Sequence, residues 1–203
     1  MGERLVCNQN VAGSIPVTST NYCREDLVTR YHNMKIAITG HTQGIGNAIY
    51  KYFAENNEVH GFSRSNGYNI ADRLSRQQIV EAVKEFDIFV NNAYNNYDGS
   101  QLAMLIEMCS VWKDTDKIII NISSRYTNAD NRYSLTKKQL NEFCEKNLYN
   151  TLYILNISPG LVDTNRVKNV QGKRMSTDEI ISVIDFALNN RSKFKVHNIT
   201  FGV

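Results

Sequence analysis

The stretch Lys35-Ile36-Ala37-Ile38-Thr39-Gly40-His41-Thr42-Gln43-Gly44-Ile45-Gly46 decides the fold that we expect for this chain. Its first five residues form a short apolar run typical of a buried parallel strand. A glycine-rich turn follows at once, and apolar residues then recur at helical spacing at Ile45, Ile49, Tyr52 and Phe53. Glycines let a ligand approach the backbone closely, and the free N–H groups at a helix start attract anions. Strand, turn and helix in this order predict a phosphate-binding loop for a dinucleotide; an ordinary glycine-rich turn is the alternative.

The next strand expected along the chain, 58–62, ends at Ser63-Arg64-Ser65. A carboxylate at this place binds the ribose 2′-hydroxyl of NAD, but neither Asp nor Glu occurs here. An arginine suits a 2′-phosphate instead. We therefore expect Arg64 to favour NADP(H), the alternative being a solvated arginine in a loop.

Strands and helices alternate over the rest of the chain. Further strands are expected at 68–70, 87–91, 117–122, 151–157 and 196–201, and helices at 75–84 (with Ser75 as N-cap), 101–112, 131–147 and from 176 onward. This alternation predicts an α/β fold, a Rossmann-type doubly wound parallel sheet in a single domain. Strand ends of such a sheet lie at one edge, so we expect the segments 40–46, 91–93 and 159–160 to converge in one cleft with Arg64, Ser124 and Tyr133.

Tyr133 and Lys137 lie four residues apart in the helix expected at 131–147, which places both side chains on one face. A lysine ammonium beside a phenol stabilises the phenolate, and such a tyrosine can give a proton to a substrate oxygen or accept one. A core tyrosine followed by a solvated lysine is the alternative. Ser123 and Ser124 follow the preceding strand, where their hydroxyls either hold a substrate oxygen or cap a turn.

Composition limits the function classes. The chain has 203 residues, enough for one domain with a sizeable core, and its 42% hydrophobic and 21% charged content is that of a globular protein. The net charge of +3 is too small and scattered to favour a nucleic-acid partner, and no apolar run approaches a membrane span. None of the four cysteines, Cys7, Cys23, Cys109 and Cys144, has metal-ligand or redox-pair spacing. We expect reduced thiols, no metal site and a cytoplasmic location.

Residues 1–33 show neither helical nor strand periodicity and resemble no secretory signal. We expect them to be a disordered leader, or an extension that is not natively translated. The folded domain, an NAD(P)-binding one, is then expected to span 34–203.

Taken together, residues 34–203 resemble the short-chain dehydrogenase/reductase family, as an unusually short member. The stretch 39–46 looks like the coenzyme loop of that family, and Asn91-Asn92-Ala93 is similar to its N-N-A-G motif, with Tyr94 where glycine is usual. Tyr133 and Lys137 match its Y-x-x-x-K motif, and Ser124 resembles its catalytic serine.

The resemblance implies an NADP(H)-dependent oxidoreductase acting on a small-molecule carbonyl or alcohol, in a homo-oligomer. Tyr133 is then the proton donor, Lys137 stabilises the phenolate and binds the coenzyme ribose, and Ser124 binds the substrate oxygen. The coenzyme-binding residues that it implies are Gly40, Thr42, Gln43, Gly44, Ile45, Gly46, Ser63, Arg64, Asn69, Asn92, Ala93, Tyr133, Lys137, Pro159, Gly160 and Thr164. A coenzyme-binding sensor or interaction protein with little turnover is the alternative.

Two departures from the family pattern favour that alternative, and a third concerns the substrate loop. The spacing from Ser124 to Tyr133 is tighter than usual, which trims one wall of the substrate pocket. An asparagine usual in the helix after the N-N-A-G motif is missing, and Ser100 is the nearest polar residue that the sequence suggests. The substrate loop is short, covering only 165–175, and it is basic through Arg166, Lys168, Lys173 and Arg174. Such a loop either steers an anionic substrate, grips the coenzyme phosphates or is simply solvated.

Overall fold

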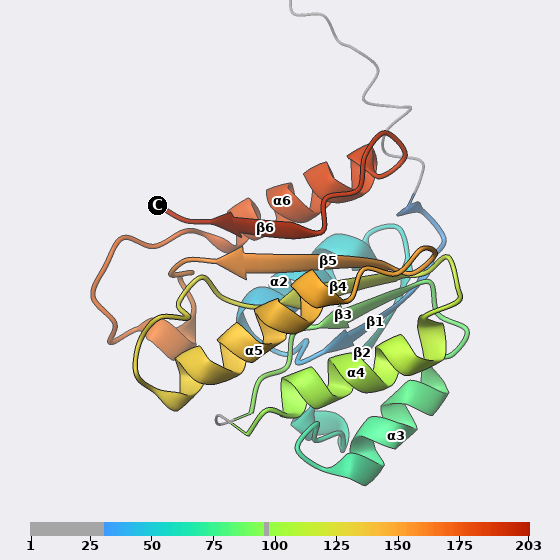
Figure 1. The fold of residues 1–203 in the computed structure, drawn as a ribbon, viewed down its shortest axis with the longest axis horizontal. Coiled ribbons are helices and arrows are strands. Elements are labelled where there is room, and N and C mark those ends of the chain that lie inside the picture. The colour runs from blue at the N-terminus through green and yellow to red at the C-terminus, as the bar shows by residue number, and fades with distance from the viewer. Residues whose placement is uncertain (1–30, 96–97) are drawn as a thin grey trace, which may run out of the picture.

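The computed structural model describes residues 31–95 and 98–203, which form a six-stranded sheet in the order β2-β1-β3-β4-β5-β6. All neighbouring strands are parallel, which confirms the predicted doubly wound α/β fold (Figure 1). The strands are β1 (Lys35–Thr39), β2 (Glu58–Phe62), β3 (Ile88–Asn91), β4 (Ile118–Ile122), β5 (Tyr153–Pro159) and β6 (Asn198–Phe201). The strand order reverses beside β1, where open α/β sheets form their ligand crevice.

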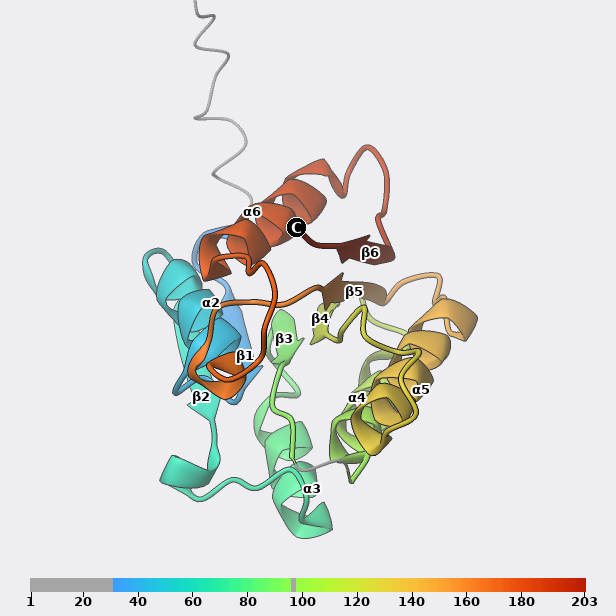
Figure 2. The same ribbon diagram turned by 90° about the vertical axis from the view of Figure 1, so that its left-hand side faces the viewer.

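Helices cover both faces of the sheet. On one face lie α2 and α6, and on the other lie α3, α4 and α5 (Figures 1 and 2). Their bounds are α2 (Gly44–Ala54), α3 (Arg73–Ala82), α4 (Ser100–Trp112), α5 (Arg132–Lys146) and α6 (Thr177–Asn190), with short 3₁₀ turns η2 (Arg64–Asn66) and η3 (Asn165–Val167). Figure 2 looks at the carboxyl edge of the sheet, from which the loops after the strands emerge.

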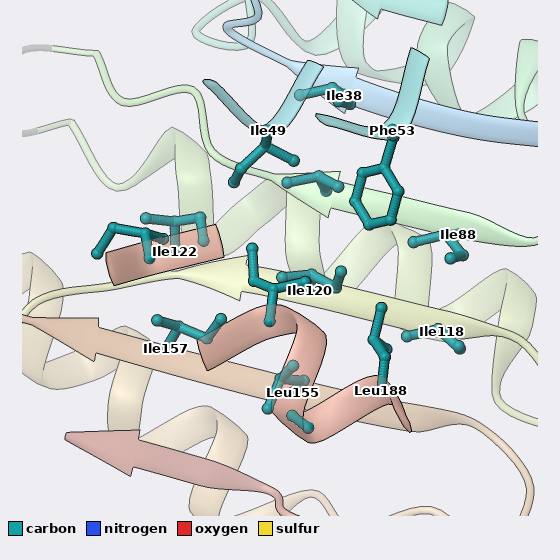
Figure 3. Close-up of a cluster of buried hydrophobic side chains, with 14 of the residues drawn as sticks. Ile38, Ile49, Phe53, Ile88, Ile118, Ile120, Ile122, Leu155, Ile157 and Leu188 are labelled. Atoms are coloured by element: carbon teal, nitrogen blue, oxygen red, sulfur yellow. The ribbon is translucent and has the colours of Figure 1, made fainter. Parts of the chain in front are cut away.

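Two apolar layers hold this arrangement, one on each side of the sheet. Figure 3 shows the layer under α2 and α6, in which Ile49 and Phe53 of α2 and Leu188 of α6 pack on the isoleucines of β3, β4 and β5. The opposite layer includes Phe89, Met104, Met108 and Trp112, all buried. Burial on both faces explains why the central strands read as unbroken apolar runs.

The segment 68–70, expected to be a strand, is not one. Instead the backbone N–H of Asn69 donates to Ser75 Oγ at 2.8 Å. The helix after it also begins earlier than expected, because Asp72 and not Ser75 is its N-cap and accepts from the N–H groups of Leu74 and Ser75. A carboxylate at the N-cap satisfies two donors and interacts favourably with the helix dipole, which a serine one turn inside the helix cannot do.

Most of the leader expected at 1–33 lies outside the described residues. Of its last three residues, Tyr31 packs against the core and donates from its hydroxyl to the carbonyl of Leu188 at 2.9 Å. Cys109 and Cys144 are buried free thiols. Within the described ranges, no helix combines the length and apolarity needed to span a bilayer. Likewise, residues 31–95 and 98–203 hold no cluster of three metal-ligating side chains.

Candidate active site

The glycine-rich turn joins β1 to α2 as the sequence predicts. Gly40 and Gly44 have positive φ angles of 72° and 57°, which glycine adopts without strain. A Cβ on Gly46 would lie 2.2 Å from the carbonyl oxygen of Gly40, so the loop closes only around a glycine there. The N-cap of α2, Gln43, makes no side-chain capping bond, and Thr42 beside it is exposed. The first N–H groups of α2, around Ile45, therefore face the crevice without a side-chain cap, as a bound phosphate requires.

The end of β3 is bonded to this loop. Thr39 Oγ1 accepts from the backbone N–H groups of Asn92 and Ala93, both at 3.1 Å. The Asn92 side chain donates to the carbonyls of Thr39 and Gly40 at 3.2 and 3.1 Å. These bonds fix the floor of the crevice between β1 and β3.

At the end of β2, Ser63 and Asn66 form a capping box that turns the chain into η2. Arg64 begins this turn and is exposed, and no ion pair engages it in the described parts of the chain. Asn69 is half-buried, and its side chain accepts from the N–H of Ala71 at 3.2 Å. The guanidinium of Arg64 is therefore available to bind a phosphate at the end of β2. The side-chain oxygen of Asn69 is already hydrogen-bonded to the backbone of Ala71.

Lys137 is buried on α5, with only 4% of its surface exposed. Its Nζ donates to Gln101 Oε1 at 2.7 Å and to the carbonyl of Ile122 at 3.2 Å. The same Nζ lies 5.9 Å from the ring centroid of Tyr133 and 4.9 Å from that of Tyr94. The two tyrosine rings pack edge to face at 5.4 Å. The predicted Tyr133 and Lys137 pair is thus brought together, with Tyr94 as a third member.

Burial lowers the pKa of Lys137 from 10.5 to about 7, and the positive charge of Arg166 adds to this effect. Both partners of the Lys137 Nζ are neutral oxygens, so no carboxylate within the described ranges offsets the cost of burying its charge. A lysine held in this way is a strong attractor for an anionic ligand, which would restore its protonated form.

Sequence reasoning missed Gln101, at the start of α4. Its side-chain amide donates to the carbonyls of Asn91 and Ile122 at 2.9 and 2.8 Å, which fixes its Oε1 toward Lys137. Gln101, and not the Ser100 that the sequence suggested, is thus the polar side chain of this helix that bonds Lys137. No local signal marks Gln101, because only the sheet brings α4 and α5 together.

A row of asparagines crosses the carboxyl half of the sheet behind this cluster. Asn91, Asn121, Asn156 and Asn198 occupy paired positions on β3, β4, β5 and β6. Each side-chain amide donates to the next in line, at 2.8, 2.7 and 3.0 Å. Because Asn91 also donates to the carbonyl of Gln101 at 3.0 Å, the row anchors the residue that holds Lys137.

Ser124 follows β4 and is buried, and its Oγ accepts from the N–H of Tyr126 at 3.1 Å. Its carbonyl accepts from the side chain of Asn141 on α5 at 3.2 Å. The hydroxyl of Ser124 therefore keeps its proton available for a substrate oxygen. Ser123 is also buried, and its Oγ has no hydrogen-bond partner within the described ranges.

The segment after β5 crosses the carboxyl edge toward α2 (Figure 2). Pro159 is buried at the end of β5, and the N–H of Gly160 donates to Phe201 of β6 at 2.8 Å. Farther along, Thr164 reaches the glycine-rich turn, since a Cβ built on Gly44 would lie 3.3 Å from its Cγ2. The segment thus runs from the end of β5 to the glycine-rich turn.

No family model matches this sequence, and no curated protein matches it either. Solved structures do match. A short-chain dehydrogenase from Burkholderia cenocepacia in complex with NADP is 15% identical, with a TM-score of 0.67 over 85% of this chain and 90% of that one. A glucose dehydrogenase from Caenorhabditis elegans in its apo form is 22% identical, with a TM-score of 0.65 over 86% of this chain and 97% of that one.

A 3-ketoacyl-(acyl-carrier-protein) reductase from Brucella melitensis complexed with NADH is 15% identical, with a TM-score of 0.65 over 85% of this chain and 97% of that one. Identities this low show a shared architecture and leave chemistry to be argued from the site itself. The chain therefore has the fold of the short-chain dehydrogenases and reductases.

Proposed function

We propose that this chain is an NADP(H)-dependent oxidoreductase of the short-chain dehydrogenase/reductase type, which interconverts a carbonyl and a hydroxyl group on a small molecule. The observation that carries this proposal is the cluster of Tyr133, Lys137 and Gln101 at the carboxyl edge of the sheet. It lies at the same edge as the uncapped start of α2, which supplies N–H donors for the coenzyme phosphates.

A nicotinamide coenzyme, held by the glycine-rich turn and the start of α2, would supply a hydride with the two electrons of the new C–H bond. Tyr133 gives its hydroxyl proton to the carbonyl oxygen, which completes the alcohol. The ammonium of Lys137 stabilises the phenolate left on Tyr133, and Ser124 donates a hydrogen bond to the same substrate oxygen. In the reverse direction Tyr133 accepts the proton.

A second candidate function, a coenzyme sensor with little turnover, is favoured by two contacts. The ring of Tyr94 lies against both Tyr133 and Lys137, and Thr164 lies against Gly44. Both contacts fill space beside the catalytic pair and the phosphate loop. A sensor can use a movement of the Tyr94 ring or of Thr164 on coenzyme binding as its signal.

Titration of the full chain with NADPH and with NADH, followed by coenzyme fluorescence, tests both candidates, and Tyr133→Phe separates them. For an enzyme, this variant binds NADPH like the parent chain but loses carbonyl reduction by at least about 100-fold. Tyr126→Phe, at an exposed tyrosine near Ser124, is the matched control and keeps full turnover. Turnover that survives Tyr133→Phe contradicts the catalytic assignment, and no binding of either coenzyme contradicts both functions.

A further inference from the structure

Arg166, in the short turn η3, lies against the residue that covers the catalytic pair. Its guanidinium carbon is 4.4 Å from the ring centroid of Tyr94. The same ring contacts Lys137 Nζ at 4.9 Å and packs on the ring of Tyr133 at 5.4 Å. Arg166 is therefore one aromatic ring away from both candidate catalytic side chains.

The loop that carries Arg166 is held in place by Arg174. The Nη2 of Arg174 donates to the carbonyls of Val167, Lys168 and Val170 at 3.1, 3.1 and 2.9 Å. Its Nη1 pairs with Asp163 at 3.2 Å. Since Arg174 takes this carboxylate, Arg166 has no acidic partner in the part of the chain that the structure describes. The backbone of the loop is thus held in place by Arg174, while the Arg166 side chain is exposed.

Two cations consequently meet at Tyr94 without a counter-charge among the described residues. Lys137 is bonded only to neutral oxygens, and the nearby charge of Arg166 contributes to lowering its pKa. An anion placed here gains from both charges, although Lys137 is buried and Arg166 is exposed. A guanidinium offers two parallel N–H donors, the geometry that a carboxylate accepts best.

We propose that Arg166 binds a carboxylate of the substrate, so that the site acts on small oxo acids and the corresponding hydroxy acids. This inference rests on the proposed oxidoreductase function. The carbonyl then lies beside Tyr133 and Ser124, and the carboxylate lies a few bonds away at the edge of Tyr94. Arg166 sets specificity in this arrangement and takes no part in proton transfer.

The competing assignment gives Arg166 to the coenzyme pyrophosphate. Thr164, two residues earlier, already lies against Gly44 of the phosphate loop. The Arg166 guanidinium instead lies over the ring of Tyr94, which follows β3 and packs on Tyr133. The two assignments predict different effects of replacing Arg166. If Arg166 binds the pyrophosphate, its loss lowers the affinity for the coenzyme; if it binds a carboxylate, its loss lowers the affinity for the substrate.

The test uses the full chain and the variants Arg166→Ala, Arg166→Lys and Lys168→Ala. Lys168 is an exposed cation of the same loop, which makes it the matched control for charge. Pyruvate and levulinate, each paired with its methyl ester, are the substrate probes for NADPH oxidation. We expect an advantage of about 10-fold or more in kcat/KM for an acid over its ester, as befits one charge-assisted bidentate contact.

Arg166→Ala is expected to abolish this advantage through the KM of the acid, with NADPH affinity unchanged. Arg166→Lys is expected to keep part of the advantage of the acid over its ester, because the positive charge remains but the two parallel N–H donors of the guanidinium are lost. Lys168→Ala retains all of it. An advantage absent from the parent chain overturns the proposal, as does an Arg166→Ala variant that loses NADPH affinity and weakens acid and ester equally.

Failure of the proposed function is recognised separately, by the lack of coenzyme binding. The carboxylate site is then decided by saturation-transfer NMR of levulinate with the full chain alone. A signal that is lost in Arg166→Ala and kept in Lys168→Ala supports the site. The lack of any levulinate signal in the parent chain overturns it.

Discussion

Gln101 Oε1 accepts a hydrogen bond from Lys137 Nζ at 2.7 Å, and both side chains are buried. The amide nitrogen of Gln101 is engaged by two backbone carbonyls, so its oxygen has one orientation. This contact joins α4 to α5 beneath Tyr133. We propose that Gln101 is a positioning residue, which would act on the proposed chemistry only through Lys137.

Replacing this acceptor should slow the proposed reaction. Gln101→Met keeps the side-chain length but leaves Lys137 with a single carbonyl acceptor, that of Ile122. A hydrogen bond to a charged group contributes about 1.5–3 kcal/mol, so we expect kcat to fall by roughly 10- to 100-fold. The pH profile of kcat checks the positioning role, since the limb due to Lys137 should move to lower pH when its cation is less stabilised.

Gln101→Glu is the informative control for that variant. It keeps an oxygen beside Lys137 but cannot donate to the carbonyls of Asn91 and Ile122. We expect the protonated form of Lys137 to be favoured while the free energy of unfolding falls by about 1–3 kcal/mol. A purely structural role for Gln101 would instead give both variants the same pH profile.

The buried Lys137 should make stability rise with pH above neutrality. Its pKa is about 7 in the folded chain and 10.5 when unperturbed, so between these values the unfolded chain binds one more proton. The free energy of unfolding then increases with pH in this window, by up to about 1.4 kcal/mol per pH unit. Below pH 7 both states are protonated and the penalty of burial is present in full.

Urea unfolding of the parent chain and of Lys137→Met between pH 7 and 8.5 checks this slope. The groups that face the ammonium are Arg166, Tyr94 and Tyr133, and they are retained in the variant. Burial also raises the pKa of Cys109 to about 12, which opposes the effect above about pH 9 in both proteins. The difference between the two slopes therefore reports Lys137; equal slopes would mean that the lysine is charged when folded.

Arg64 should distinguish the two coenzymes. Arg64→Ala removes an exposed guanidinium at the end of β2, and we expect NADPH to bind roughly 10- to 100-fold more weakly with NADH unchanged. Arg73→Ala, at an exposed arginine that begins α3, is the control and should alter neither affinity. Equal losses for both coenzymes would show that Arg64 does not read the 2′-phosphate.

The asparagine row should contribute strongly to stability. Asn121 is fully buried, accepts from Asn91 and donates to Asn156. Asn121→Leu leaves one side-chain N–H of Asn91 and the Oδ1 of Asn156 buried without partners, at a cost of about 1–3 kcal/mol each. Ile120→Val on the same strand is expected to cost only about 1 kcal/mol, and denaturant unfolding compares the two. A small loss in Asn121→Leu would indicate that the row relaxes around the substitution.

The sequence alone determined the doubly wound fold and two strands with their bounds, 35–39 and 58–62. These features depend on local patterns: apolar runs buried on both faces, helical spacing and glycines at turns with positive φ. It also placed Tyr133 and Lys137 on one helix face, because that spacing is local.

Tertiary structure then decided which distant side chains meet Tyr133 and Lys137. Gln101 lies 36 residues from Lys137, and Arg166 reaches Tyr94 only because the segment after β5 crosses the sheet edge. Contacts of this kind depend on how elements pack, which no local periodicity encodes.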